Sequence, residues 1–137
     1  VSADPGRTRV PMTLGRLADA SLILYDTSHG FDDPTRRQLA ARAQEAGVQI
    51  EAKIEVEHVE TALELVSRGL GDTIAARAVT RGAHLPANVA GVPFAEPFHD
   101  HFALITRRGA KVSPGTQSLI DLLRDWARMV EARLATG

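Results

Sequence analysis

The chain has 137 residues, with 16 Lys and Arg against 17 Asp and Glu, which gives a formal net charge of −1. Hydrophobic residues make up 44% of the sequence, which is enough for the core of a folded domain and too many for a disordered chain. The near-zero charge argues against direct binding to DNA or to an anionic membrane, and the absence of cysteine excludes disulfides and thiolate chemistry.

No run approaches the roughly 18 apolar residues of a membrane span, so we expect no membrane partner. The absence of cysteine makes a reducing cytoplasm the expected location. The N-terminal residues 1–7 contain neither an initiator Met nor the apolar centre of a signal peptide. We therefore expect the chain to be a piece of a longer protein.

The first elements are a lead-in segment at residues 1–20 and a short apolar run at residues 21–25. This run is bounded by turn-forming residues and is typical of a strand buried on both faces. Asp33 followed by Pro34 predicts the start of a helix, because Asp caps helices and Pro fits their first position. Gly47 predicts the end of the same helix.

Apolar and polar side chains alternate over residues 48–57, a pattern typical of a strand with one solvated face near the edge of a sheet. The spacing of apolar residues then predicts an amphipathic helix over 59–70, a brief strand over 71–76 and a helical turn over 78–81. Strands that alternate with helices of this length favour a parallel sheet with right-handed crossovers.

Two further apolar runs, at residues 89–95 and 101–106, are predicted as strands. Ser113 and Pro114 predict the start of a long C-terminal helix that continues to residue 134. Together these elements predict an α/β fold in which helices flank a mixed, mainly parallel sheet.

The loop after the first strand contains Thr27, Ser28 and His29. Open α/β sheets place ligand sites beyond the carboxyl ends of their strands, where hydroxyls and free backbone N–H groups can hold an anion. An ordinary polar turn explains the same residues. A serine hydrolase with Ser28 and His29 is a weaker alternative, because adjacent residues rarely face each other and no Gly-x-Ser-x-Gly motif is present.

Histidines provide a possible metal site at His99 and His101, which would share one face of a strand. Two imidazoles do not close a metal site, and His84 as a third ligand is only a guess. We therefore expect exposed histidines, with no metal and no cofactor.

Five stretches carry a family resemblance when they are taken in order. They are residues 12–25, residues 54–63, residues 66–71, residues 92–94, and the helix that starts at residue 113. This series resembles the effector-binding domain of LysR-type transcriptional regulators over about residues 10–130. The sequence departs from the family at Asp72, where an apolar residue is usual, and at Arg77, near the position of a Leu-Pro-like pair.

The resemblance implies a periplasmic-binding-protein-like domain in which two α/β lobes hold an effector between them. Residues 1–20 would be a lead-in from an incomplete proximal lobe, residues 21–106 the distal lobe, and residues 107–137 a return segment with the C-terminal helix of the proximal lobe. The winged helix-turn-helix domain of the family has no counterpart in this sequence, so contact with DNA would be made only by a part outside it.

The resemblance also implies a site for a small acidic metabolite and no catalytic residue. The matching cleft positions are Thr27, Ser28, His29, His58, Asp72 and Thr73. The effector would shift the population of lobe angles in a homo-oligomer and so change how the DNA-binding domains are presented. The alternatives are a small α/β hydrolase-like enzyme and a solute-binding lobe of a transport system.

Overall fold

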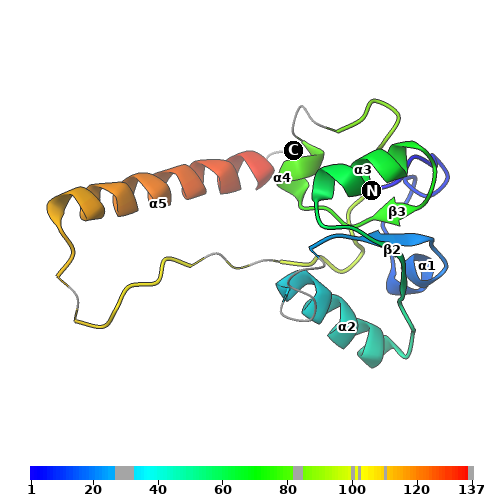
Figure 1. The fold of residues 1–137 in the computed structure, drawn as a ribbon, viewed down its shortest axis with the longest axis horizontal. Helices are drawn as coiled ribbons and strands as arrows, with labels where there is room; N and C mark the ends of the chain where they lie inside the picture. The colour runs from blue at the N-terminus through cyan, green and yellow to red at the C-terminus, as the bar shows by residue number, and fades with distance from the viewer. Residues whose placement is uncertain (27–32, 82–84, 100, 102, 110, 136–137) are drawn as a thin grey trace. The chain divides into compact units, whose positions relative to one another are not determined.

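The computed structural model describes residues 1–26, 33–81, 85–99, 101, 103–109 and 111–135 (Figure 1). The chain forms two compact units, Val1–Asp100 and His101–Gly137. Within the described residues, no helix combines the length and hydropathy that crossing a membrane requires.

The first unit contains a parallel sheet of three strands in the order β2-β1-β3. The strands are β1 (Leu22–Leu24), β2 (Ala52–Glu55) and β3 (Asp72–Thr73). Leu22 of β1 is the partner of Ala52 on one side and of Asp72 on the other, so the three strands begin at one edge of the sheet. The parallel sheet confirms the predicted topology, although each strand is shorter than the apolar run that predicted it.

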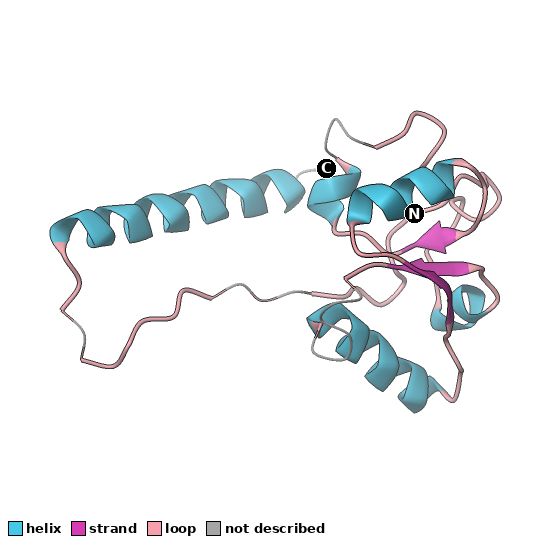
Figure 2. Ribbon diagram, viewed as in Figure 1, coloured by secondary structure: helices cyan, strands magenta, loops and turns pink. Residues whose placement is uncertain are grey.

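Helices cover both faces of this sheet (Figure 2). The helices α1 (Leu14–Ala18) and α2 (Pro34–Ala46) pack on the face of Leu22, where Leu17 and Leu39 are buried beside it. The helix α3 (Val59–Ser67) packs on the opposite face, where Ala62 and Val66 surround the fully buried Ile23. The predicted α/β fold, with helices flanking the sheet, is therefore confirmed.

The helix ends follow the local signals in the sequence. The Asp33 carboxylate accepts a hydrogen bond of 2.7 Å from the Arg36 N–H, and Pro34 is the first residue of α2. Gly47 ends that helix with a φ of +67°, in the left-handed region that glycine adopts without steric cost. A shorter helix, α4 (Arg77–Thr80), occupies the place of the predicted helical turn.

The predicted strand at residues 89–95 is wrong. That segment makes only isolated bridges, from Ala90 to Ser2 and from Phe94 to Met12, and the Ala90 bridge is antiparallel. Pro93 lacks the N–H that a continuous ladder needs, and the Val89 N–H donates to Pro86 within a turn. Residues 89–95 therefore pair only with the N-terminal segment, one residue at a time, and do not join the sheet.

The predicted strand at residues 101–106 is also wrong, since residues 101 and 103–106 form no strand. Their side chains are exposed, with Ile105 at 93% of its full exposure. An apolar run pairs as a strand only where a sheet edge receives its N–H and C=O groups.

The second unit contains the helix α5 (Pro114–Ala135). The Ser113 hydroxyl caps it by accepting a hydrogen bond from the Thr116 N–H at 3.2 Å, as the Ser-Pro pair predicts. Its polar surface carries exposed ion pairs between residues three apart, while several large apolar side chains are also exposed. These apolar side chains are Leu119, Leu122, Leu123, Trp126 and Met129.

Candidate functional site

The carboxyl ends of β1 and β2 form one edge of the sheet, and backbone hydrogen bonds continue beyond both strands. The Val56 N–H donates to the Leu24 carbonyl at 2.9 Å, and the Asp26 N–H donates to the Glu57 carbonyl at 3.3 Å. His58 follows Glu57 directly and is the N-cap residue of α3. The chain that leaves β1 therefore lies beside the start of α3.

Asp26 makes a sharp turn where β1 ends. Its φ of +59° is left-handed, and no other non-glycine residue in the described part of the chain has a positive φ. Such a backbone costs free energy that surrounding contacts must offset, and it often occurs at functional sites. The predicted site residues Thr27, Ser28 and His29 lie outside the described residues.

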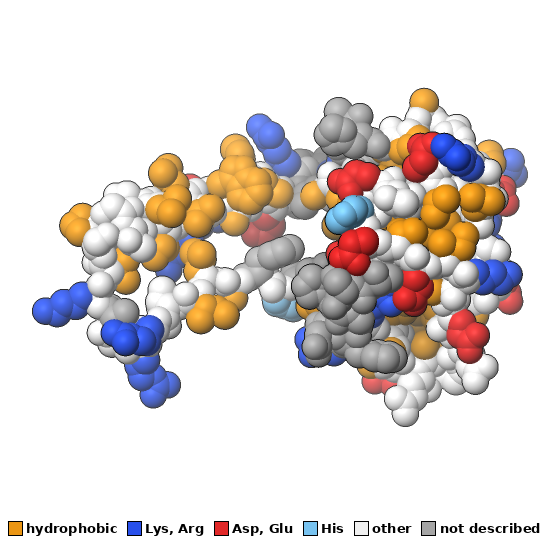
Figure 3. All heavy atoms as spheres, viewed as in Figure 1, with side chains coloured by type: hydrophobic (Ala, Val, Ile, Leu, Met, Phe, Trp, Pro, Cys, Tyr) orange, Lys and Arg blue, Asp and Glu red, His pale blue; other side chains and the backbone are white. Residues whose placement is uncertain are grey.

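His58 offers an exposed imidazole at the same edge, and its side chain makes no capping hydrogen bond to α3. In a parallel sheet the helix that follows each strand starts at the carboxyl edge, so the N–H groups at the start of α3, which the His58 side chain does not cap, lie there. Glu57 and Glu60 are exposed on either side of His58 in the sequence. Figure 3 shows acidic side chains that border a histidine on the face in view.

Arg36 joins three elements at the carboxyl edge. Its Nε and Nη2 donate to the Tyr25 carbonyl at 3.2 and 2.9 Å, and its Nη1 donates to Glu55 Oε1 at 3.2 Å. The side chain is only 15% exposed, and the backbone N–H of the same residue donates to the capping carboxylate of Asp33. Nothing in the sequence pattern separates this arginine from an ordinary solvated residue of α2.

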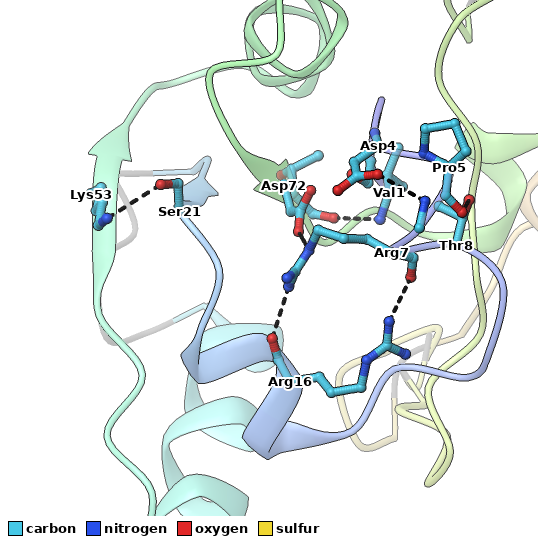
Figure 4. Close-up of polar contacts among 12 residues, drawn as sticks. Val1, Asp4, Pro5, Arg7, Thr8, Arg16, Ser21, Lys53 and Asp72 are labelled. Carbon is cyan, nitrogen blue, oxygen red and sulfur yellow. Dashed lines mark hydrogen bonds and ion pairs between the residues drawn. The ribbon is translucent and has the colours of Figure 1, made fainter.

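Asp72 lies at the opposite edge, because its partner Leu22 is the first residue of β1. Its side chain is 8% exposed, and its carboxylate accepts a hydrogen bond from Arg7 Nε in an ion pair (Figure 4). The Asp72 carboxylate is thus already paired with Arg7. Its contact with an effector stays a prediction. The structure does not bring Asp72 to the edge that holds His58.

Arg7 is also hydrogen-bonded to Arg16, and we call these two residues the arginine clasp. Arg7 Nη2 donates to the Arg16 carbonyl at 2.8 Å, and Arg16 Nη2 donates to the Arg7 carbonyl at 3.2 Å (Figure 4). Residues 1–20 were predicted only as a lead-in, without a role in holding Asp72. The signal that sequence analysis missed is Asp72 itself, because a carboxylate within a buried strand needs a cationic partner.

A hollow of about 320 Å³ lies beside the arginine clasp at the amino edge. The backbone of Val1 pairs with Thr73 nearby: the Val1 nitrogen donates to the Thr73 carbonyl at 2.8 Å, and the Thr73 N–H donates to the Val1 carbonyl at 3.0 Å. The hollow is lined by Ser2, Ala3, Asp4, Arg7, Asp19, Ala20, Ser21, Gly69, Gly71 and Asp72.

Thr73 is 2% exposed, and its hydroxyl donates to the Ile23 carbonyl at 2.8 Å. We expect Thr73→Val to lower the free energy of unfolding by about 1–2 kcal/mol, because it leaves a buried carbonyl without this donor. Urea unfolding followed by circular dichroism measures the effect. Thr80→Val is the control, since its hydroxyl bonds to Arg77 at an exposed helix end. Equal losses in the two variants would contradict the assigned role of the Thr73 hydroxyl.

The two other kinds of site considered for this sequence rest on residues that the structure describes only in part. Among the described residues, no group of three or more His, Asp or Glu side chains is placed to hold a metal. His99 and His101 are exposed, and His84 lies outside the described residues. Ser28 and His29, the candidate hydrolase pair, also lie outside them.

The comparison with protein families gives one match. A family model described as the LysR substrate binding domain matches residues 1–128. No curated protein and no solved structure matches the chain.

Proposed function

Because the chain belongs to the LysR substrate-binding domain family of ligand-sensing regulator domains, we propose that it binds a small acidic metabolite at the carboxyl edge of its sheet. The observation that carries this proposal is the hydrogen bond from the Asp26 N–H to the Glu57 carbonyl at 3.3 Å. It joins Asp26, which precedes Thr27 in the sequence, to Glu57, which precedes His58. We propose that Thr27, Ser28, His29 and His58 act together at this edge.

The chemistry of this edge suits an anion in two ways. The N-terminus of α3, which the His58 side chain does not cap, supplies backbone N–H groups and the positive end of a helix dipole, whereas the Arg36 N–H in α2 is already bonded to Asp33. The hydroxyls of Thr27 and Ser28 and the imidazoles of His29 and His58 would add donors around a carboxylate. Asp72 and Thr73 stay in the proposal as predicted contacts. They are weaker candidates than the other four residues, because their side chains already make hydrogen bonds within the first unit.

We propose further that the effector acts by shifting a population. In this proposal residues 21–106 are the distal lobe, and residues 1–20 and 107–137 belong to the proximal lobe. An effector held between the lobes favours one lobe angle, because only a ligand with different affinities for two states can shift their equilibrium. The shift then changes how a homo-oligomer presents DNA-binding domains that lie outside this sequence.

Replacing Ser28 with alanine is expected to weaken effector binding by a little more than tenfold, because a hydrogen bond to a charged group contributes about 1.5 kcal/mol. The measurement is isothermal titration of the intact regulator, which supplies both lobes, with a panel of small monocarboxylates and dicarboxylates. Ser67→Ala is the matched control, since the Ser67 hydroxyl is exposed and bonds to Glu64 within α3.

The panel also contains amines and neutral sugars of similar size, because Glu57 and Glu60 give the edge its own negative charge. Amide chemical shifts locate each ligand that binds. Binding of amines alone would overturn the acidic class of the effector. Shifts confined to the residues around Asp72 would overturn the choice of the carboxyl edge.

A further inference from the structure

Arg36 lies in the first turn of α2, and its side chain is largely buried against the end of β1. Its guanidinium makes two hydrogen bonds to one backbone carbonyl, that of Tyr25, and one to the Glu55 carboxylate. A backbone carbonyl is fixed by the chain, whereas an exposed carboxylate can turn away into solvent. The contact with Tyr25 therefore constrains the protein more strongly than the ion pair does.

The exposed fractions of the Arg36 and Glu55 side chains also indicate that the ion pair is the weaker of the two contacts. The Arg36 side chain is 15% exposed, while the Glu55 side chain is 51% exposed. Water screens an ion pair of that kind, and such pairs contribute little to stability. The guanidinium is planar, so its Nε–H and Nη2–H groups, which both donate to the Tyr25 carbonyl, fix the orientation of that carbonyl as well as its distance.

The Tyr25 carbonyl belongs to the peptide that joins Tyr25 to Asp26. Its orientation is therefore linked to the left-handed turn at Asp26, where φ is +59°. We infer that Arg36 is a positioning residue: it holds the Tyr25–Asp26 peptide and thereby sets the direction in which the chain leaves β1. The importance of this for effector sensing rests on the function proposed above, but the conformational role does not.

The test compares amide hydrogen exchange in Arg36→Met and in the parent chain, without any ligand. We expect the Asp26 and Val56 amides to exchange about tenfold faster in the variant, because their hydrogen bonds lie beside the released peptide. The Asp72 amide, which donates to the Ser21 carbonyl at 2.9 Å, reports on the β1–β3 pairing. Its exchange should change less than twofold.

Three further variants separate the contacts. Glu55→Gln should leave all three exchange rates within about twofold of the parent, because it removes only the screened ion pair. Arg36→Lys should fall between Arg36→Met and the parent, since an ammonium cannot reproduce the fork of a guanidinium. Arg37→Met is the matched control, because Arg37 is the next residue of α2 and is exposed.

A uniform acceleration of all three amides in Arg36→Met would show a merely structural role and overturn the inference. Unchanged exchange at Asp26 and Val56 would overturn it as well. An equal response to Glu55→Gln would assign the effect to the ion pair and contradict the role of the carbonyl contact. Because no arm needs an effector, failure of these tests is distinct from a failure to find a ligand.

Discussion

Replacing Gly71 with alanine is expected to lower the free energy of unfolding by about 3 kcal/mol, at the upper end of the usual cost of overpacking. A Cβ at this position would lie far inside van der Waals contact with the Ser21 carbonyl oxygen. It would also meet the Ser21 carbonyl carbon at 3.1 Å and Ile23 Cγ1 at 3.2 Å. The obstacle is the backbone before β1, which cannot move aside without loss of the hydrogen bond from Asp72 N–H to Ser21.

Urea unfolding followed by circular dichroism measures this effect against a matched glycine. Gly15 lies in α1 and has an ordinary backbone conformation, and a Cβ there would meet nothing within 4 Å. Gly15→Ala is therefore expected to be neutral or to stabilise by up to about 1 kcal/mol, as helix propensity dictates. A Gly71→Ala chain as stable as Gly15→Ala would show that β3 and β1 do not approach each other as described.

The elements that sequence analysis could predict are those whose causes are local. The Asp33–Pro34 pair and Gly47 mark the ends of α2, because a cap and a left-handed glycine act within one turn of the helix. The order of strands and helices likewise predicted the parallel sheet, since successive strands separated by helices have few other ways to pair.

The elements that sequence analysis missed depend on contacts between distant residues. The N-terminal residues pair with segments far along the chain, through the bridges from Ser2 to Ala90 and from Met12 to Phe94. The pattern of residues 1–20 does not indicate which residues these bridges join. The same absence of a local signal explains the two wrong strands, because an apolar run does not show whether a sheet edge is free to receive it.

The approach of His58 to the end of β1 was predictable from the sequence, and the contacts that support it were not. A parallel sheet places the ends of its strands at one edge, so the approach of His58 to the end of β1 follows from topology alone. The link from Arg36 to the Tyr25 carbonyl does not follow, because an arginine on a helix is usually solvated. Asp72 shows the same limit, since its cationic partner lies 65 residues away in the sequence.

The ion pair of Arg7 and Asp72 leads to the second large prediction. Arg7→Met should lower the free energy of unfolding by about 2–3 kcal/mol, below the usual 3–5 kcal/mol because Arg7 is 25% exposed and solvent screens the pair. The loss arises because the Asp72 carboxylate, 8% exposed, is left without its cation. Arg9→Met is the control, since Arg9 is exposed and lies two residues along the same segment.

The double variant Arg7→Met/Asp72→Val tests whether the pair itself stabilises the fold. A buried ion pair is often replaced by apolar residues at little cost, because neither charge then has to leave water. We expect the double variant to unfold within about 1 kcal/mol of the parent and to be more stable than Arg7→Met alone. Urea unfolding of all four chains gives the coupling energy. Additive losses would contradict this account and assign the stability to the hydrogen bond from Arg7 Nη2 to the Arg16 carbonyl, which the double variant also lacks.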